Sequence, residues 1–167
     1  MTITEQKAAQ RKAGIAARRA LSDTERTRSN AALCARIMAL DCFKKAENIL
    51  LYAAFGGEAD LSALAVEAAR QGKTLAYPVC GEGFSLTAAV PGPDGWEVGA
   101  YGIRTPILSQ SEILRPDQLD LVLVPCTAFD TTCRRVGMGK GYYDRYLPRC
   151  TRAVKPVSYT HLTLPTT

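Results

Sequence analysis

One loop of this chain has residue types suited to binding an anion, three glycines at alternate positions: Gly137, Gly139 and Gly141. Glycine adopts positive φ without strain and lets a backbone approach a ligand closely, so that amide groups can point at phosphate oxygens. Four cations and one carboxylate surround these glycines: Arg134, Arg135, Lys140, Arg145 and Asp144. This combination is suited to a polyphosphate with its magnesium ion. A solvated basic surface turn is the alternative, since glycine spacing alone gives many false matches.

A strand and a helix are expected to hold this loop in place. Upstream, residues 119–124 form a short apolar run that is typical of a strand covered on both faces, and Pro125 ends it. Downstream, aromatic and apolar residues recur at helical spacing: Tyr142, Tyr143, Tyr146 and Leu147. A loop between a strand and the N-terminus of a helix can direct backbone amides at a bound anion.

The segment VPCTAFDTTCRRVGMGKGYYDRYL, residues 124–147, resembles the signature of the 5-formyltetrahydrofolate cyclo-ligase family, also called methenyltetrahydrofolate synthetases. A proline, a Phe-Asp pair, an arginine and a Gly-x-Gly-x-Gly-Tyr-Tyr-Asp run occur in the family's order. The resemblance extends from about Lys7 to Val157 and is loose over residues 83–118. Two substitutions within the signature are Cys126, where glycine is common, and Val136, where leucine is usual.

The resemblance implies the activity: conversion of 5-formyltetrahydrofolate into 5,10-methenyltetrahydrofolate, with consumption of ATP and release of ADP and phosphate. ATP and Mg²⁺ are the implied cofactors. The formyl oxygen attacks the γ-phosphate, N10 closes the ring on the activated carbon, and phosphate leaves. No covalent enzyme intermediate is required. Phosphoryl transfer depends mainly on positioning and charge stabilisation, which suits a chain whose only histidine is His161, near its end.

The resemblance also implies site residues, with Lys140 and Arg135 as the catalytic cations. Asp144 would bind magnesium. The nucleotide would contact a larger set: Lys7, Arg11, Arg135, Gly137, Met138, Gly139, Lys140, Gly141, Tyr142 and Arg145. The folate would contact Ala53, Phe55, Glu58, Met138 and Tyr142.

The N-terminal part of that set depends mainly on the resemblance. Lys7 and Arg11 lie in the segment KAAQR, which is similar to the family's K-x-x-L-R, with Gln10 where leucine is usual. From their residue types alone, two such charges are more often solvated side chains of a helix than ligands of a nucleotide.

Glu58 is a candidate for a directional contact to the folate, because a carboxylate can accept paired hydrogen bonds from an amino-pyrimidine edge. It follows the first predicted strand, and ligands of open α/β sheets bind beyond the carboxyl ends of the strands. The segments expected to converge there are residues 55–58, 78–80 and 126–130. The alternative for Glu58 is a surface acid near the start of a helix, where Asp60 would be the cap.

Charge is distributed unevenly along the chain, whose net charge is +5. Residues 1–36 carry eight Lys or Arg and three Asp or Glu, residues 37–133 carry six and twelve, and residues 134–167 carry seven and one. Two basic segments that met at one site would attract a highly charged ligand, such as ATP or a polyglutamylated folate. A basic nucleic-acid-binding module is disfavoured, because neither aromatic interleaving nor a docking motif is present. Another nucleotide- or phosphosugar-binding α/β enzyme remains an alternative, with Glu58 and Asp130 as its acid–base pair.

We expect a monomeric cytoplasmic enzyme that binds neither membranes nor nucleic acids. The longest apolar run, residues 49–55, is too short to span a bilayer, and the charged N-terminus is unlike a signal peptide. The six cysteines form no CxxC pair and have no metal-ligand spacing, which favours reduced thiols and argues against a zinc site.

The predicted fold is a layered α/β/α domain, Rossmann-like, with a mainly parallel sheet, over residues 1–157. Ser22 and Glu25 form a capping box that starts the second helix. The expected helices are 5–20, one from 22 onward, and 60–71; the expected strands are 48–54, 74–79, 84–89 and 119–124. A turn is expected at 91–95 and irregular structure at 99–106.

Residues 158–167 are interpreted as a non-native tail that contributes little structure. This segment, SYTHLTLPTT, has four threonines and no Asp, Glu, Lys or Arg. The family resemblance implies that a core strand and a second metal-binding aspartate would follow Val157. We therefore expect a truncated chain that lacks both.

Overall fold

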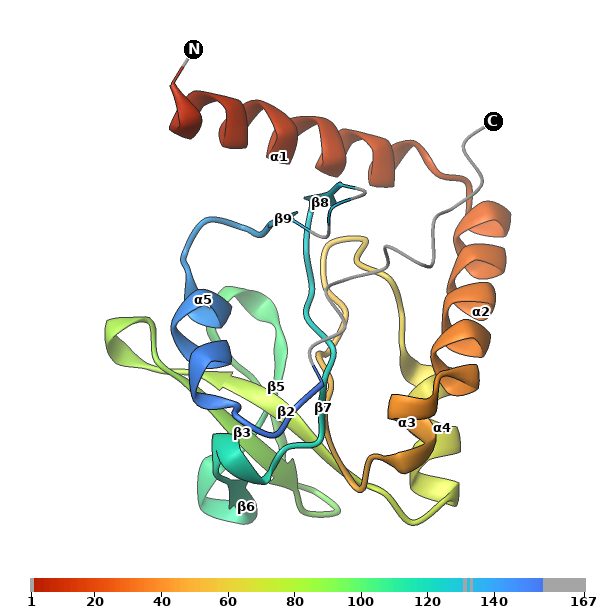
Figure 1. Ribbon diagram of the computed structural model, residues 1–167, viewed down its shortest axis with the longest axis vertical. Coiled ribbons are helices and arrows are strands. Elements are labelled where there is room, and N and C mark those ends of the chain that lie inside the picture. The colour runs from red at the N-terminus through yellow and green to blue at the C-terminus, as the bar shows by residue number, and fades with distance from the viewer. Residues whose placement is uncertain (1, 131, 133, 155–167) are drawn as a thin grey trace.

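The computed structural model describes residues 2–130, 132 and 134–154 (Figure 1). Its centre is a five-stranded sheet with the order β6-β3-β2-β1-β7. The strands are β1 (Asn48–Leu50), β2 (Thr74–Cys80), β3 (Leu86–Pro91), β6 (Ser111–Leu114) and β7 (Leu121–Val122). β1 pairs in parallel with β2 and β7, and an isolated parallel bridge joins Leu121 to Val154. β2–β3 and β3–β6 are antiparallel. The predicted α/β fold with a mainly parallel sheet is confirmed.

Helices cover both faces of this sheet (Figure 1). The helices are α1 (Ile3–Ala20), α2 (Asp23–Ala39), α3 (Asp41–Lys45), α4 (Ser62–Arg70) and α5 (Tyr142–Tyr146). Successive strand side chains point to opposite faces, so Ile49 packs into one core with α2, α3 and α4, whereas Leu50 packs into a second core with Tyr146 of α5. Both strand residues are fully buried. Burial on both faces gives the predicted three layers.

The predicted starts of the helices are largely correct. Ser22 and Glu25 form the expected capping box, in which Glu25 N donates to Ser22 Oγ at 3.3 Å and Ser22 N donates to Glu25 Oε2 at 2.8 Å. The predicted cap of α4 is displaced by one residue. Asp60 Oδ1 accepts from Ser62 N at 2.9 Å, but Leu61 occupies the N-cap position.

Several predicted boundaries in the middle of the chain are wrong. Residues 99–106 contain a strand, β5 (Arg104–Pro106), which forms an antiparallel hairpin with β4 (Trp96–Val98). A run this short has no readable alternation, so only its partner strand reveals it. The strand predicted from Phe84 begins instead at Leu86, because residues 82–84 form a 3₁₀ turn. β1 ends at Leu50, although Leu51 N still donates to Ala76 O at 2.9 Å.

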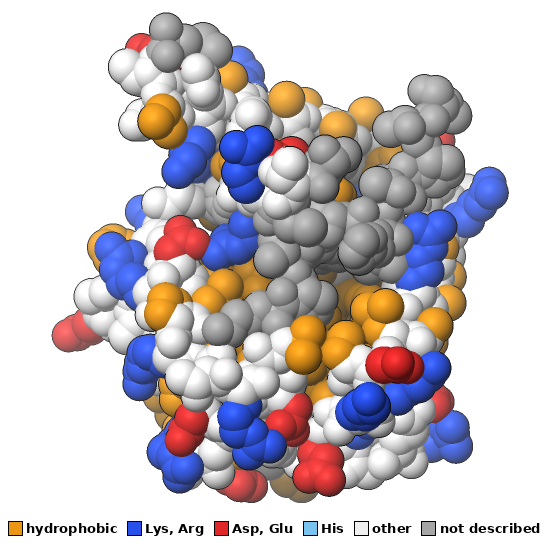
Figure 2. Space-filling model, viewed as in Figure 1, with side chains coloured by type: hydrophobic (Ala, Val, Ile, Leu, Met, Phe, Trp, Pro, Cys, Tyr) orange, Lys and Arg blue, Asp and Glu red, His pale blue; other side chains and the backbone are white. Residues whose placement is uncertain are grey.

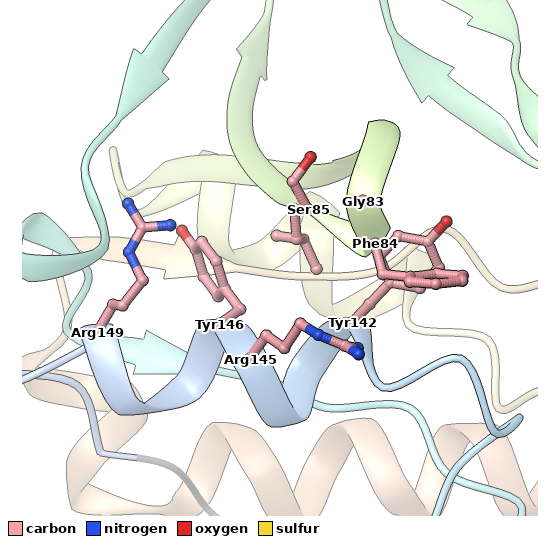
Figure 3. A pocket seen from close by; sticks show the side chains of 8 residues that line it. Gly83, Phe84, Ser85, Tyr142, Arg145, Tyr146 and Arg149 are labelled. Atoms are coloured by element: carbon pink, nitrogen blue, oxygen red, sulfur yellow. The ribbon is translucent and has the colours of Figure 1, made fainter.

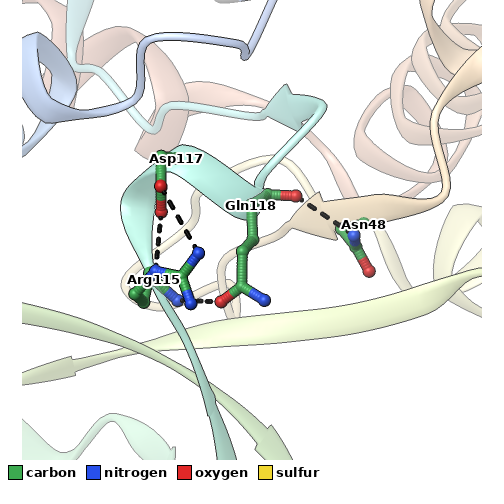
Figure 4. A network of polar contacts seen from close by, with 4 residues as sticks. All are labelled: Asn48, Arg115, Asp117 and Gln118. Carbon is green, nitrogen blue, oxygen red and sulfur yellow. Dashed lines mark hydrogen bonds and ion pairs between the residues drawn. The ribbon is translucent and has the colours of Figure 1, made fainter.

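Polar contacts fix the beginnings of β1 and β7 beside each other. Asn48 Nδ2 donates to Gln118 O at 3.1 Å, and Asn48 N donates to Asp120 Oδ2 at 2.9 Å. Arg115 pairs with Asp117 and closes the turn before β7 (Figure 4). The register of the two parallel strands is therefore set at their amino ends, and this aligns the carboxyl ends from which the site residues emerge.

Helix α1 lies outside both cores and has no buried residue. It crosses over a small hairpin made of β8 (Ala128–Phe129) and β9 (Arg135–Val136) (Figure 1). Gly14 allows this contact, because a Cβ at that position would overlap the carbonyl oxygen of Thr127. Packing on this hairpin brings a basic N-terminal helix above the glycine loop.

The predicted domain boundary after Val157 and the predicted tail, residues 158–167, lie outside the described residues. Among the described cysteines, all five are free thiols: Cys34, Cys42, Cys80, Cys126 and Cys150. Within the described part of the chain, no helix combines the length and the apolar character needed to cross a membrane.

Candidate functional site

The glycine loop joins β9 to α5. Two of its three glycines have the left-handed backbone that the sequence predicts for all three. Gly139 has φ 99° and Gly141, the N-cap of α5, has φ 73°. Gly137 does not adopt positive φ, so the expectation fails there. Its carbonyl oxygen accepts a hydrogen bond from outside the loop.

That hydrogen bond comes from helix α1. Arg11 Nε donates to Gly137 O at 2.8 Å across 126 residues of sequence. The Arg11 guanidinium also covers Gly139, where an added Cβ would lie 3.3 Å from Nη2. Lys7 is exposed one helical turn earlier, on the same face as Arg11. Figure 2 shows Lys and Arg side chains along α1 and along the edge of the molecule that faces it. The two basic segments therefore meet at the glycine loop.

Arg135 and Asp144 form an ion pair within the loop region, with 2.5 Å between Nη2 and Oδ1. The Arg135 side chain is 15% exposed and that of Asp144 is 72% exposed. Among the described residues, no three His, Cys, Asp or Glu side chains gather into a metal site. One exposed carboxylate beside the glycine loop nevertheless has the ligand chemistry that Mg²⁺ uses, since this ion commonly takes one or two carboxylates together with substrate phosphates and water.

Arg145 donates hydrogen bonds to the backbone of the glycine loop. Its Nη1 donates to Lys140 O at 3.0 Å and to Gly141 O at 3.1 Å. These bonds hold the backbone of the loop, while the side chains of Lys140 and Met138 remain exposed. Lys140 is thus available to an incoming anion, whereas one nitrogen of Arg145 is already engaged with the loop.

Three of the five residues predicted for the folate, Ala53, Phe55 and Glu58, lie after β1, whereas Met138 and Tyr142 lie in the glycine loop and at the start of α5. Phe55 N donates to Glu58 Oε2 at 3.2 Å, and Glu58 N donates to Phe55 O at 3.1 Å, so the two residues close one turn. Burial raises the pKa of Glu58. The backbone hydrogen bond from Phe55 and the positive charge of Arg18 in α1 lower this pKa, but by less. Glu58 is therefore a partly desolvated carboxyl group rather than a solvated surface acid. Ala53 is half-buried just before this turn.

Tyr142 connects the loop to the end of β2. Electrostatic interactions link its hydroxyl to the side chains of Cys80 and Tyr101. Phe55 lies close to the same segment, because a Cβ at Gly102 would be 3.9 Å from the Phe55 ring. Residues from β1, from β2 and from the loop before α5 thus converge at the carboxyl edge of the sheet, as expected for this class of fold.

A profile of the 5-formyltetrahydrofolate cyclo-ligase family matches residues 3–165 of this chain. The chain belongs to this family. The 5-formyltetrahydrofolate cyclo-ligase of Escherichia coli strain K12 is 28% identical over 148 residues, which cover 86% of this chain and 81% of the relative. The corresponding protein of Mus musculus is 27% identical over 152 residues, which cover 85% of this chain and 73% of the relative.

Two solved structures have the same fold as this cyclo-ligase family member. The NMR structure of Aquifex aeolicus 5,10-methenyltetrahydrofolate synthetase is 36% identical, with a TM-score of 0.77, and the match covers 89% of this chain and 75% of that one. The 5,10-methenyltetrahydrofolate synthetase of Mycoplasma pneumoniae is 24% identical, with a TM-score of 0.71, and the match covers 87% of this chain and 79% of that one. At this identity the similarity shows a shared fold alone. The family resemblance of residues 124–147 is confirmed, and with it the expectation of an enzyme.

One pocket of this chain was not predicted from its sequence. It has a volume of about 200 Å³ and lies between α5 and the turn before β3 (Figure 3). Its lining includes Phe84, Ser85, Tyr142, Arg145, Tyr146 and Arg149. The four-residue spacing of the two arginines is the one sequence signal that could have indicated it, because i and i+4 side chains of a helical segment share a face.

Proposed function

We propose that this protein converts 5-formyltetrahydrofolate into 5,10-methenyltetrahydrofolate and consumes ATP in the reaction, with ADP and phosphate as the other products. The observation that carries the proposal is the hydrogen bond from Arg11 Nε to Gly137 O. It joins the N-terminal basic motif to the glycine-rich motif, and both motifs resemble those of the cyclo-ligase family.

The nucleotide phosphates would bind between α1 and the glycine loop. Lys7, Arg11 and Lys140 supply positive charge there, and the backbone amides of the loop supply donors. Arg135 would join them once its contact with Asp144 is exchanged for a phosphate oxygen. Cations held in advance around a transferring phosphoryl group stabilise the charge that develops in the transition state.

Asp144 would hold Mg²⁺, since it is the exposed carboxylate beside this loop. When bound, the ion would neutralise charge on the β- and γ-phosphates. The chain's own contribution is a carboxylate in the first turn of α5, three residues after Gly141, which caps the helix.

The folate would lie across the carboxyl edge of the sheet. Glu58 would accept hydrogen bonds from the amino-pyrimidine edge, and Ala53, Phe55, Met138 and Tyr142 would contact the rest of the ring system. This arrangement would direct the N5-formyl group towards the loop that carries the phosphates. When two reacting groups are held together in this way, proximity and orientation supply much of the rate enhancement.

The reaction needs no nucleophile from the protein. The formyl oxygen attacks the γ-phosphorus and ADP leaves; N10 then attacks the formyl carbon, loses its proton, and phosphate departs with the former formyl oxygen. We expect the enzyme to act in the cytoplasm as a monomer, without nucleic acid, on a folate that can carry several glutamates. The free thiols of the five described cysteines agree with a reducing compartment.

The alternative of a phosphosugar enzyme would need Glu58 and Asp130 as an acid–base pair. Hydrogen bonds from Thr132 and Arg134 lower the pKa of Asp130 to about 2, even though the group is exposed. A carboxyl group with so low a pKa is poorly matched to proton transfer near neutral pH. We therefore favour the cyclo-ligase reaction.

The direct test is an absorbance assay for methenyltetrahydrofolate formation, with ATP and Mg²⁺ each present or omitted. We expect product only when both are present. Arg11→Ala should reduce kcat/KM at least tenfold, whereas Arg19→Ala, a matched change on the exposed side of the same helix, should leave it within twofold. Absence of product both from this chain and from a chain with a restored C-terminal segment, or product without ATP, would contradict the proposal.

A further inference from the structure

The pocket beside α5 contains a buried hydroxyl group whose hydrogen-bonding capacity is unused. Tyr146 is 3% exposed, yet among the described residues its hydroxyl has no hydrogen-bond partner. Buried polar groups are normally paired, so an unpaired one in the wall of a pocket indicates a ligand that supplies the partner. Burial raises the pKa of Tyr146 well above its usual value, so the group stays protonated and acts as a donor.

Two guanidinium groups give this pocket a positive charge. Arg149 lies 6.0 Å from the centre of the Tyr146 ring, and Figure 3 shows its guanidinium directed to the same side as the Tyr146 hydroxyl. Arg145 contributes the second guanidinium, which also lies 5.3 Å from the centre of the Phe84 ring. Within the described parts of the chain, no carboxylate lines the pocket and neither arginine forms an ion pair. The donors therefore match an anionic acceptor.

The rest of the pocket wall is aromatic. The rings of Phe84 and Tyr142 meet edge to face, with 5.7 Å between their centroids. Phe84 is partly exposed and has φ 58°, a backbone conformation that is rare for a bulky residue. Such a wall suits a flat apolar group attached to the anion.

We propose that this pocket binds a carboxylate of the glutamyl chain of the folate, with Arg149 and the Tyr146 hydroxyl as donors. The inference rests on the proposed function. Tyr142 is the link, because it directly follows the last glycine of the loop, interacts with Cys80 and Tyr101 at the carboxyl edge of the sheet and also lines this pocket. The aminobenzoyl group would lie against Phe84 and Tyr142. The carboxylate would then reach Arg149, which lies at the protein surface, where further glutamates could extend into solvent.

A nucleotide also combines a flat ring with an anion, so the test must separate the two sources. Equilibrium binding to the full chain is measured by calorimetry with 5-formyltetrahydrofolate, with its triglutamate form, with 5-formyltetrahydropteroate, which lacks glutamate, and with a non-hydrolysable ATP analogue. The variants are Arg149→Gln and Tyr146→Phe. Arg70→Gln is the control, because it makes the same change of charge on α4, on the opposite face of the sheet.

We expect Arg149→Gln to weaken binding of both glutamate-containing folates about tenfold, with binding of the pteroate and of the ATP analogue unchanged within twofold. Tyr146→Phe should weaken the same two ligands about threefold to tenfold. Its melting temperature without ligand should equal or exceed that of the wild type, since the substitution removes an unpaired buried group. If Tyr146 only supported the fold, Tyr146→Phe would instead lower the melting temperature and leave the preference for glutamate-containing folates unchanged.

Each other outcome overturns the inference. Weakened binding of the ATP analogue to Arg149→Gln, with folate binding unchanged, would assign the pocket to the nucleotide. Equal binding of the pteroate and the glutamate-containing folates to the wild type would exclude a carboxylate subsite. If the wild type binds no folate at all, the proposed function fails as well, whereas normal folate binding by both variants contradicts this inference alone.

Discussion

The guanidinium of Arg135 and the carboxylate of Asp144 form an ion pair that joins β9 to the first turn of α5. The Arg135 side chain is largely buried, and a buried guanidinium requires an acceptor, whereas Asp144 reaches out to solvent. The two groups proposed to bind phosphate and metal are therefore partners of each other. When a nucleotide binds together with its metal ion, a phosphate would replace Asp144 as the negative partner of Arg135. The metal ion would replace Arg135 as the positive partner of Asp144.

Asp144→Asn should raise the Mg²⁺ concentration needed for half-maximal activity by about tenfold or more, because the variant loses the negative charge that would hold the ion. The free energy of unfolding should fall by less than about 1 kcal/mol, since the carboxylate is mostly exposed. Activity titrated against Mg²⁺, together with thermal unfolding, measures both effects. Asp41→Asn, which removes an exposed carboxylate in α3, is the control, and a Mg²⁺ dependence equal to that of the wild type would refute the assignment.

Lys140→Ala should lower turnover and weaken ATP binding by about tenfold to a hundredfold, the range expected for loss of one charged hydrogen bond at about 1.5–3 kcal/mol. The fold should remain intact, because this side chain is exposed. Steady-state kinetics with varied ATP tests the expectation against Lys45→Ala, an exposed lysine of α3. Unchanged kinetics in Lys140→Ala would show that the glycine loop does not bind the γ-phosphate.

Glu58→Gln should weaken folate binding by about 1–3 kcal/mol, the cost of losing a charged acceptor, while ATP binding stays nearly normal. Calorimetry with each ligand separately measures the two affinities. An equal loss for folate and ATP would mean that Glu58 maintains the local fold rather than contacting the folate.

The pH dependence of stability provides a second test at Glu58. Burial raises the pKa of this group above 4.5 in the folded state, so the folded protein binds the proton more tightly than the unfolded chain does. The stability contributed by Glu58 is therefore complete below about pH 4.5 and is lost as pH rises through the folded-state pKa. Thermal unfolding should show Glu58→Gln equal to the wild type near pH 4 and more stable near pH 8. A difference that shrank with rising pH would contradict the assigned environment.

Gly14→Ala should destabilise the protein, although alanine favours a helix by about 1 kcal/mol over glycine. The added Cβ would overlap the Thr127 carbonyl oxygen, so α1 would have to move away from β8. That movement would pull Arg11 from Gly137 and lower ATP affinity. Thermal unfolding and ATP binding measure the effect. A higher melting temperature with unchanged ATP binding would show that the contact between α1 and the hairpin is dispensable.

Local residue types determined much of what could be predicted. Residues 119–124 are apolar apart from Asp120, and the structure buries Leu121 and Val122 completely, because a strand between two layers of helices has no solvent face. The capping box at Ser22 and Glu25 formed as predicted because all of its partners lie within three residues. The family signature likewise lies within one segment of the chain.

Only the tertiary structure decided which distant residues meet. No local pattern places Arg11 on Gly137, since that contact depends on the path of α1 over β8 and β9. The pocket between Phe84 and Arg149 has the same origin, because its walls come from segments that lie far apart along the chain. The hairpin of β4 and β5 pairs neighbouring segments, but each strand is too short for its pattern to predict it. The chain's sequence determined its family and the chemistry of its loop, whereas long-range packing determined the surroundings in which those residues act.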